Sequence, residues 1–431
     1  MKILGGMNVV GSDLQKKEGV EDSVELFKKD LIKSAGGMYN EKLVDILCKQ
    51  SLESLSFLEE MGIKFAHLQK LGGHSASRTL LTKDCNEVVE KLSEKIHQLA
   101  DEARITVLPG YQVLKVSPHE QGVDLTLMTE HKGLVDPVIS GDAVILATGG
   151  FHGNLDMLSQ IHPNFMGVTS YAKGASIGHA RANMSLRELG AKVAGMKNIQ
   201  FASFCAYEQS EEGKPKDLDV VHEMIVNLGA ILIDESGARF INESFTQNTL
   251  TSFIIDRFHQ LNPVANKSTP TAFLVFPQKV LHEIQNNLSS YFGLLSDKIE
   301  KFENFEDFIS RSGVNEKYFS STIQEIDNHL QGEEDDLVGR KDFAARFNRK
   351  DPFYRLRVTP GIHRTLGGFV IDANCSPLFP DYRKIMNVFL AGSITSGIHG
   401  NNILTGNSLL ESVVFGRIAA HSAARGVPRK K

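Results

Sequence analysis

The chain has 431 residues, enough for two or three domains with substantial cores, and its 41% hydrophobic and 23% charged content is ordinary for a globular protein. Its 47 basic and 52 acidic residues leave a net charge of −5, which gives no reason to expect nucleic acid or an acidic membrane surface as a partner. No stretch approaches the roughly 18 consecutive apolar residues of a transmembrane helix, and no signal-peptide pattern precedes the first predicted elements, so we expect neither.

Cysteine spacing bears on both the compartment and metal binding. The four cysteines lie far apart and form no C-x-x-C pair: Cys48, Cys85, Cys205 and Cys375. This pattern is typical of a reducing, intracellular compartment, cytoplasmic or mitochondrial, and it argues against a zinc or iron–sulfur site. We therefore expect no metal ligands.

The first 150 residues read as helices mixed with strands. Apolar residues recur at helical spacing in segments 23–34, 40–61 and 86–103. Shorter apolar or alternating runs predict strands at 105–108, 111–116, 123–129 and 142–148. The mixture indicates an α/β fold.

From residue 200 onward the pattern changes. Segments 229–233 and 239–242 predict a β-hairpin around the turn at 235–237. Helical spacing follows at 280–289, 305–312 and 316–330, and the acidic stretch 331–336 is expected on the solvent face.

The last third ends in the most informative stretch of the chain. An apolar strand at 388–390 runs into a loop that contains Gly397, Gly400 and Gly406, and a helix is predicted from 408 to 420. A strand, a glycine loop and a helix start allow backbone N–H groups to approach a flat or anionic ligand.

Seven motifs occur in one order along nearly the whole chain. They are Gly5-Gly6-Met7-Asn8, Gly72-Gly73-His74-Ser75, Ala147-Thr148-Gly149-Gly150-Phe151, Gly229-Ala230-Ile231-Leu232, Arg239-Phe240-Ile241-Asn242-Glu243, His363-Arg364-Thr365-Leu366-Gly367-Gly368 and the stretch 388–417. As an ordered set they resemble the fumarate reductase flavoprotein family, most closely its soluble yeast and trypanosomatid type.

The resemblance implies an α/β fold with two domains. A Rossmann-like FAD-binding domain is expected from residues 1–199 and 363–431, with an α+β capping domain inserted at 200–362. The chain starts at what is the family's second flavin loop, so the first βαβ unit, with its G-x-G-x-x-G turn, is expected to be missing. Either the sequence is a fragment, or the protein has lost the element on which most FAD affinity rests, and another protein chain fills the exposed sheet edge.

The resemblance also implies where FAD binds. Binding is expected to be noncovalent, because the first loop has no histidine of the kind that tethers flavin. The cofactor positions carried over from the family are Gly5, Gly6, Met7, Asn8, Gly72, Gly73, His74, Ser75, Ala147, Thr148, Gly149, Gly150, Gly392, Ser393, Gly406, Asn407, Ser408 and Leu409. At Ser393 the family's glutamate, a partner of the ribityl chain, is absent.

The substrate site departs from the family, in which arginines and histidines hold a dicarboxylate and a capping-domain arginine donates a proton. Glu223 and His363 keep the family's residue. The substituted positions are Ala202 for a substrate histidine, Val226 for a proton-pathway arginine, Gln247 for the proton donor and Ile403 for the carboxylate clamp. A shifted alignment would let Arg239, Arg257 or Arg364 supply one of the missing cations.

Three hypotheses follow for function. A working FAD-dependent fumarate reductase is supported by motif order but lacks the cations that a dicarboxylate requires. A flavin or nucleotide binder with a more apolar pocket is supported by the retained glycine loops. We favour the third, a catalytically silent paralogue (a pseudoenzyme) with a structural or partner-binding role.

Overall fold

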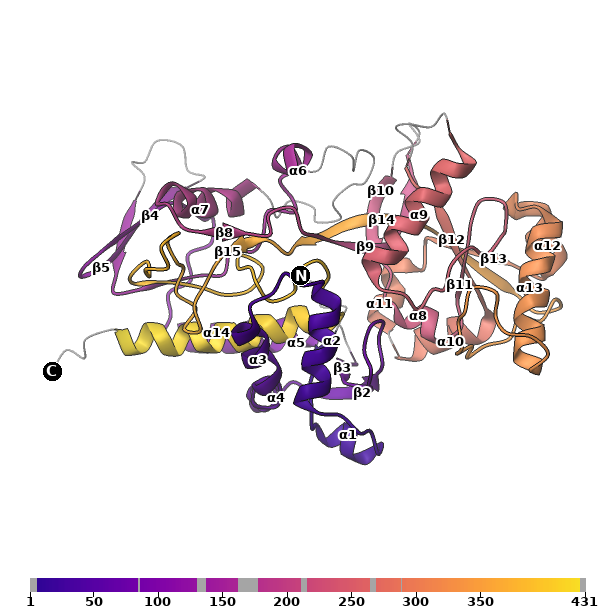
Figure 1. The fold of residues 1–431 in the computed structure, drawn as a ribbon, viewed down its shortest axis with the longest axis horizontal. Helices are drawn as coiled ribbons and strands as arrows, with labels where there is room; N and C mark the ends of the chain where they lie inside the picture. Colours follow the sequence, from indigo (N-terminus) through magenta and orange to yellow (C-terminus); the bar gives the residue numbers. More distant parts are fainter. Residues whose placement is uncertain are drawn as a thin grey trace.

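The computed structural model describes residues 6–83, 86–129, 137–161, 177–210, 215–263, 269–287 and 289–426. Gly5 of the predicted cofactor set and Cys85 lie outside these residues. Figure 1 shows two lobes side by side, joined by the long strands β9 (Ile199–Gln209) and β14 (Phe353–Thr365). The predicted domain limits at 199/200 and 362/363 fall within these two strands and stay a prediction.

The right-hand lobe of Figure 1 is built on a six-stranded antiparallel sheet in the order β10-β9-β14-β12-β11, with β13 also paired to β14. Its other strands are β10 (Pro215–Val220), β11 (Ile231–Ile233), β12 (Ala272–Pro277) and β13 (Ile299–Phe302). Its helices are α8 (Met224–Asn227), α9 (Gln247–Leu261), α10 (Gln278–Asn287), α11 (Ser289–Leu295), α12 (Phe305–Ser312) and α13 (Glu316–Gln331).

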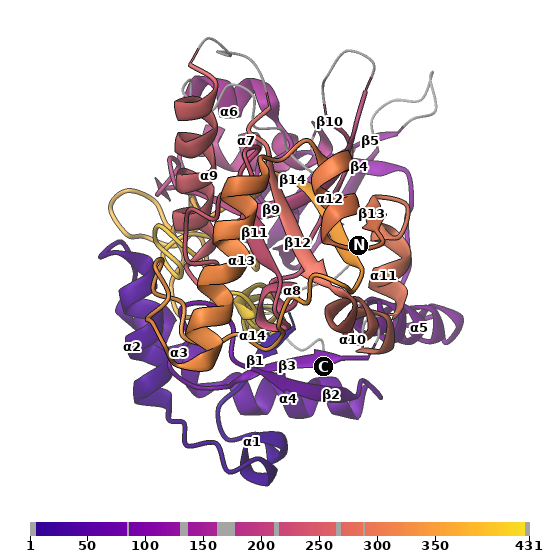
Figure 2. The same cartoon turned by 90° about the vertical axis from the view of Figure 1, so that its right-hand side faces the viewer.

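Both faces of this sheet are covered, as Figure 2 shows from the side. Along β12, Leu274 and Phe276 join a core that includes residues of α9 and α10. The alternate residues Phe273 and Val275 join a second core, which the phenylalanines of α12 and α13 dominate. Because successive side chains of a strand point to opposite faces, a strand buried on both sides is continuously apolar, as β12 is.

The left-hand lobe contains four smaller sheets. Its strands are β1 (Met7–Asn8), β2 (Phe65–Gln69), β3 (Thr79–Thr82), β4 (Tyr111–His119), β5 (Gly122–Thr129), β6 (Val138–Gly141), β7 (Val144–Leu146), β8 (Val193–Ala194), β15 (Gly368–Phe369) and β16 (Val388–Leu390). Its helices are α1 (Asp13–Lys17), α2 (Val24–Ala35), α3 (Glu41–Lys49), α4 (Ser51–Glu60), α5 (Glu87–Asp101), α6 (Leu155–Ile161), α7 (Ile177–Glu188) and α14 (Asn407–Gly426). Among the described strands only β16 and β7 pair in parallel, and one isolated parallel bridge joins Phe369 to Thr395.

Helix α14, yellow in Figure 1, organises this lobe. It contacts β16, β7, β1, α3 and α4, and its residues Leu410, Val414, Phe415 and Ala419 are completely buried. These buried residues are the ones whose helical spacing was seen in the sequence. The predicted strand before the helix is β16. The predicted strand, loop and helix at the end of the chain are therefore confirmed.

Three predicted elements differ in the structure. The helix predicted over 40–61 is two helices, α3 and α4, which meet at Gln50. No strand forms at 105–108, where Ile105, Val107 and Leu108 are exposed, because a β-rich segment needs a neighbouring strand to pair with. Strand β11 pairs with β12 instead of forming a hairpin, although one bridge joins Ile233 to Arg239.

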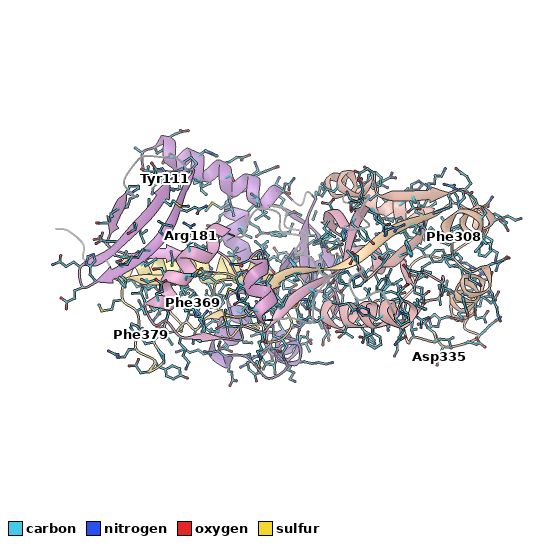
Figure 3. The ribbon with its side chains drawn as sticks, turned by 90° about the horizontal axis from the view of Figure 1, so that it is seen from above. Tyr111, Arg181, Phe308, Asp335, Phe369 and Phe379 are labelled. Atoms are coloured by element: carbon cyan, nitrogen blue, oxygen red, sulfur yellow. The ribbon has the colours of Figure 1, made fainter. Side chains whose placement is uncertain are left out.

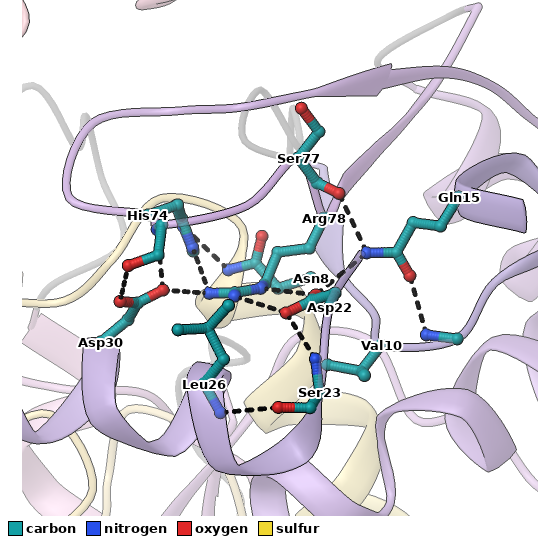
Figure 4. A network of polar contacts seen from close by, with 12 residues as sticks. Asn8, Val10, Gln15, Asp22, Ser23, Leu26, Asp30, His74, Ser77 and Arg78 are labelled. Atoms are coloured by element: carbon teal, nitrogen blue, oxygen red, sulfur yellow. Dashed lines mark hydrogen bonds and ion pairs between the residues drawn. The ribbon is translucent and has the colours of Figure 1, made fainter. Parts of the chain in front are cut away.

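A buried charge network fixes the first 80 residues (Figure 4). Arg78, completely buried, donates to Asp22 Oδ1 at 2.7 Å and to Asp30 Oδ2 at 2.5 Å. Ser75 donates its backbone N–H and its hydroxyl to the same Asp30 carboxylate. Burial by itself raises the pKa of Asp30, but the bonds from Ser75 and Arg78 outweigh it and hold that pKa below its usual value. The network ties α2 to the loop before β3.

Asp30→Asn is expected to destabilise the protein by on the order of 3 kcal/mol, because it leaves Arg78 buried and under-neutralised. The lowered pKa of Asp30 supplies stability above its unfolded value that is lost as the pH falls through the folded value, so the variant should also lose part of its acid sensitivity. Urea unfolding at several pH values measures both effects. Asp45→Asn, at a partly exposed pair with Lys49, is the control and should cost less than about 1 kcal/mol; equal losses in the two variants would contradict the expectation.

Candidate functional site

Two of the predicted cofactor loops meet at Asn8 (Figure 4). The Asn8 amide donates to the Thr405 carbonyl at 2.9 Å and to Asn407 Oδ1 at 2.7 Å, and it accepts from the Thr79 hydroxyl at 2.6 Å. The backbone N–H of Asn8 also donates to the Gly406 carbonyl. Residues about 400 positions apart in the sequence therefore form one polar cluster, as the family motifs imply.

His74 joins the same cluster as a neutral side chain. Arg78 can only donate, so His74 Nδ1, 3.2 Å from its Nη1, accepts. The proton then sits on Nε2, which donates to the Thr405 carbonyl at 3.1 Å. Burial, followed by the charge of Arg78, lowers the pKa of His74 to about 4, so the ring carries no charge at neutral pH.

The glycines of the predicted set divide into packed and open positions. A Cβ at Gly406, where φ is +93°, would lie 2.4 Å from Asn8 Oδ1, and one at Gly73 would lie 2.7 Å from Leu404. Gly6 and Gly72 likewise face backbone oxygens, whereas a Cβ at Gly149, with φ of +76°, would meet nothing within 4 Å. The first group of loops packs against protein, and the turn at Gly149 faces open space.

A cavity of about 320 Å³ lies beside that turn. Gly150 and Ser393 of the predicted cofactor set line it, together with residues of α6, α7 and β15. Thr148 lies next to the turn and donates to Asn183 Oδ1 on α7. Two groups of predicted cofactor positions are therefore gathered by the fold, one at the Asn8 cluster and one at this cavity.

The remaining predicted cofactor residues have mixed surroundings. Met7 and Leu409 are buried in the core, Ser75 bonds Asp30, and Ala147 is exposed. Gly392 has a φ of +79°, and Ser408 accepts from Arg364. None of these contacts by itself identifies a cofactor.

The structure brings two of the substrate-site positions together. Gln247, the first residue of α9, donates through its Nε2 to Glu223 Oε1, and the Thr405 hydroxyl donates to the same oxygen at 2.9 Å. The Ser203 N–H donates to Gln247 Oε1 at 2.6 Å. Burial raises the pKa of Glu223, which these neutral donors only partly offset. A carboxyl without a cation beside it favours its protonated form.

The other substituted positions are apolar and buried. Ala202 lies on β9, Val226 on α8 and Ile403 in the loop before α14. His363, the retained family histidine, is neutral as well, since burial and then the charges of Arg364 and His152 lower its pKa to about 3. The four substituted positions and His363 therefore provide no positive charge at neutral pH.

The three arginines of the shifted alignment are paired with protein carboxylates. Arg239 bonds Glu243 and Asp336, Arg257 bonds Asp234 at 2.7 Å, and Arg364 bonds Glu411 at 2.7 Å. An arginine already neutralised within the protein does not replace a substrate clamp. The geometry does not favour the shifted alignment.

A buried triad at the start of α14 was missed in the sequence. Glu411 accepts from Arg364 and lies 3.3 Å from His399 Nε2. Burial raises the pKa of Glu411, but Arg364 and His399 outweigh it and bring it down to about 2. His399 lies in the glycine loop, 12 residues before Glu411 on α14. A histidine and a glutamate on either side of a helix start were the only features of the sequence that could have predicted this contact.

Buried polar atoms without a protein partner test whether a cofactor fits. Arg364 Nε, Ser396 Oγ, His399 Nδ1 and Asn407 Nδ2 are buried and make no hydrogen bond. Ser396 and His399 lie in the loop before α14, Asn407 is the first residue of that helix, and Arg364 lies on β14. Unpaired buried polar groups are costly unless a ligand satisfies them. Together with the open turn at Gly149, they fit a polar cofactor.

The described residues offer neither a metal site nor a membrane-spanning helix. Within the described ranges, no three His, Cys, Asp or Glu side chains group closely enough to hold a metal ion. None of the helices in those ranges combines the length and the apolar character needed to cross a bilayer.

The arrangement of these loops is that of an FAD-binding type of fold, and comparison with known proteins agrees. The chain belongs to the FAD binding domain family, whose profile matches residues 4–409. It is 28% identical to the probable fumarate reductase Ifc3 of Shewanella frigidimarina, covering 98% of this chain and 68% of that protein. It is 27% identical to fumarate reductase 1 of Saccharomyces cerevisiae, covering 98% of this chain and 90% of that protein.

A solved structure is similar over the same extent. The open conformation of a flavocytochrome c3 fumarate reductase aligns with a TM-score of 0.74 and 27% identity, covering 98% of this chain and 71% of that one. The resemblance stated from the motifs is thereby confirmed.

Glu223→Gln is expected to remove a pH dependence of stability. Because the folded protein raises the pKa of Glu223 above its usual 4.5, the contribution of this carboxyl to stability is fully present below that value and is lost as the pH rises toward the folded pKa. The loss is about 1.4 kcal/mol per pH unit within that window. Thermal unfolding from pH 4 to 9 should show a flatter profile for the variant, while Glu235→Gln, an exposed control, should follow the wild type.

Gly406→Ala is expected to destabilise the protein by roughly 1–3 kcal/mol, because its backbone is left-handed and its Cβ would collide with Asn8. Gly416→Ala is the matched control, since a Cβ there meets nothing within 4 Å inside α14 and should stabilise by roughly 0.5–1 kcal/mol. Chemical denaturation measures both. A neutral Gly406→Ala would show that the two loops do not pack as described.

Proposed function

We propose that this chain is a fumarate-reductase-like flavoprotein homologue that does not turn over dicarboxylates and serves as a structural or partner-binding paralogue. The observation that carries the proposal is the contact between Gln247 and Glu223. Where the family places a proton-donating guanidinium, an amide bonds a buried carboxyl whose pKa is raised by burial. An amide does not act as the acid, and Gln247 leaves no cation there for a dianion.

Charge balance extends this reasoning to the whole site. A dicarboxylate carries two negative charges, and moving them out of water is offset only by paired cations. Ala202, Val226 and Ile403 are apolar, and His363 is neutral at physiological pH. Arg364, which follows His363 in the chain, is occupied by Glu411. We infer that the site disfavours fumarate and succinate.

The proposal retains noncovalent FAD as the cofactor. Gly149, Gly150 and Ser393 would hold it at one end, and the start of α14 with Asn407 and Ser408 at the other. Bound flavin would supply hydride transfer. The chain's own residues would orient it through backbone N–H groups and through the unpaired atoms of Arg364, Ser396 and His399. In this proposal residues 1–199 and 363–431 form the FAD-binding domain, and residues 200–362 form the cap.

A partner-binding role is supported by the parallel pair β7–β16. Parallel strands are normally covered on both faces and extended by further strands, yet among the described residues β7 pairs only with β16, and Ile145 on β7 is exposed. We propose that a second polypeptide pairs with this edge. A reducing compartment accords with the free thiols of Cys48, Cys205 and Cys375.

A second candidate is a flavin or nucleotide binder with an altered pocket, which the mostly apolar side chains around the 320 Å³ cavity favour. The visible absorption spectrum of the purified protein, before and after incubation with FAD and gel filtration, separates the hypotheses. A retained flavin band supports cofactor binding. A folded protein without a band leaves only the structural role.

The FAD-loaded protein is expected to show no fumarate-dependent oxidation of a reduced viologen dye and no thermal shift with millimolar fumarate, because the site offers no paired cations. The matched variant is Gln247→Arg with Ile403→Arg, which restores two of the family's guanidinium positions and should produce a fumarate-dependent thermal shift. Saturable oxidation by the wild type that disappears in His363→Ala would overturn the proposal.

A further inference from the structure

The chain passes between the two lobes in two long strands, β9 and β14. Figure 3, seen from above, shows β14 running from the lobe that carries Phe308 to the lobe that carries Phe369. Lobes linked in this way are expected to move relative to each other unless a sufficient interface holds them. The position of one lobe against the other therefore depends on the noncovalent contacts between them.

The loop before α14 makes three such contacts, at every second residue from 401 to 405. The bonded pairs are Asn401 O with Asn248 Nδ2 at 2.8 Å, Ile403 N with Gln200 Oε1 at 2.8 Å, and Thr405 Oγ1 with Glu223 Oε1 at 2.9 Å. Asn248 lies in the first turn of α9, Gln200 lies on β9, and Glu223 immediately precedes α8. Five consecutive residues of one lobe thus bond three separate elements of the other.

The same loop is fixed to the left-hand lobe. Ser34 on α2 accepts from Asn402 Nδ2 at 2.7 Å and donates to the Asn402 carbonyl at 3.0 Å. The Thr405 carbonyl accepts from Asn8 Nδ2 at 2.9 Å. Because its own lobe holds the loop in this way, moving the lobes apart would break the bonds from the loop to the right-hand lobe.

These three contacts need no charge from outside the protein. The bonded groups are two side-chain amides, a hydroxyl, a backbone N–H, a backbone carbonyl and a single carboxyl, that of Glu223. Burial raises the pKa of this carboxyl, which favours its uncharged form. Each hydrogen bond within the protein favours the closed arrangement modestly, and the three act together.

We propose that these contacts are a latch, made of Asn401, Ile403 and Thr405 with their three partners, that keeps the two lobes closed on each other without a bound substrate or cofactor. Gln247 supports the latch, because its Nε2 donates to the same Glu223 oxygen that accepts from Thr405. A substituted position of the predicted substrate site thereby has a structural use in this chain. The proposal goes beyond the proposed function, because it holds whether or not the chain binds FAD.

Hydrogen–deuterium exchange of the full chain, resolved to single amides, tests the latch. The reporter is the Ile403 N–H, whose acceptor lies on the other lobe, and in the wild type without added ligand it should exchange far more slowly than in the unfolded chain. Thr405→Val removes the hydroxyl and keeps the carbonyl, and it should speed this exchange roughly five- to tenfold. Asn248→Asp still accepts from the Phe201 N–H but no longer donates to Asn401, and it should speed the exchange about threefold.

The urea dependence of exchange separates opening of the lobes from unfolding. Opening exposes far less surface than unfolding does, so the exchange of Ile403 should respond weakly to low urea concentrations. The exchange of Leu274, in the core strand β12, should respond strongly. Small-angle X-ray scattering should in addition give a larger radius of gyration for the double variant Thr405→Val with Asn248→Asp than for the wild type.

Asn262→Ala is the matched control, because Asn262, at the other end of α9, donates to Glu235 at 2.9 Å within the right-hand lobe. It should leave the exchange of Ile403 unchanged. An acceleration by Asn262→Ala equal to that by Thr405→Val would overturn the proposal. Equal urea dependence of the two amides would do the same, as would protection of Ile403 that appears only after FAD or fumarate is added. Because the measurement uses no cofactor, its outcome is independent of the proposed function.

Discussion

The loop from Asn401 to Asn407 is the constraint on which the arrangement of the two lobes depends. Toward the left-hand lobe, Asn401 donates to the Ala35 carbonyl, and Thr405 accepts from Asn8 and His74. Toward the right-hand lobe, Ile403 donates to Gln200 and the Thr405 hydroxyl bonds Glu223. One short segment is thus hydrogen-bonded to both lobes. Any change that moves it alters the Asn8 cluster and the Glu223 contact together.

The same loop bears on the charge balance of the predicted substrate site. Buried charges are stable only as complete sets, so removing one guanidinium leaves its partner at a cost of several kcal/mol. Here Glu223 has neutral donors on Gln247 and Thr405, and burial shifts it toward its neutral form. Arg364 and Glu411, in contrast, form a buried ion pair in which the two charges balance each other. The scaffold therefore needs no dicarboxylate to balance its charges.

Much of the fold was readable from local pattern. The stripe of α14, the strand β16 before it and the strands β4 and β5 follow from periodicity, because each presents one regular face to a core. Helix α9 was not anticipated, since no helix was predicted between residues 242 and 280. The strand predicted at 105–108 failed for a related reason, because strand formation depends on a pairing partner that local sequence does not contain.

For the site, the sequence by itself determined the family. Residue identity and spacing also predict the order of the cofactor loops and the four substituted positions. Only the tertiary structure decided that Gln247 contacts Glu223, that Arg239, Arg257 and Arg364 are each occupied by a carboxylate, and that His399 joins Glu411. Ionisation state and charge pairing depend on burial and on distances between residues far apart in the chain. Those quantities exist only once the chain is folded.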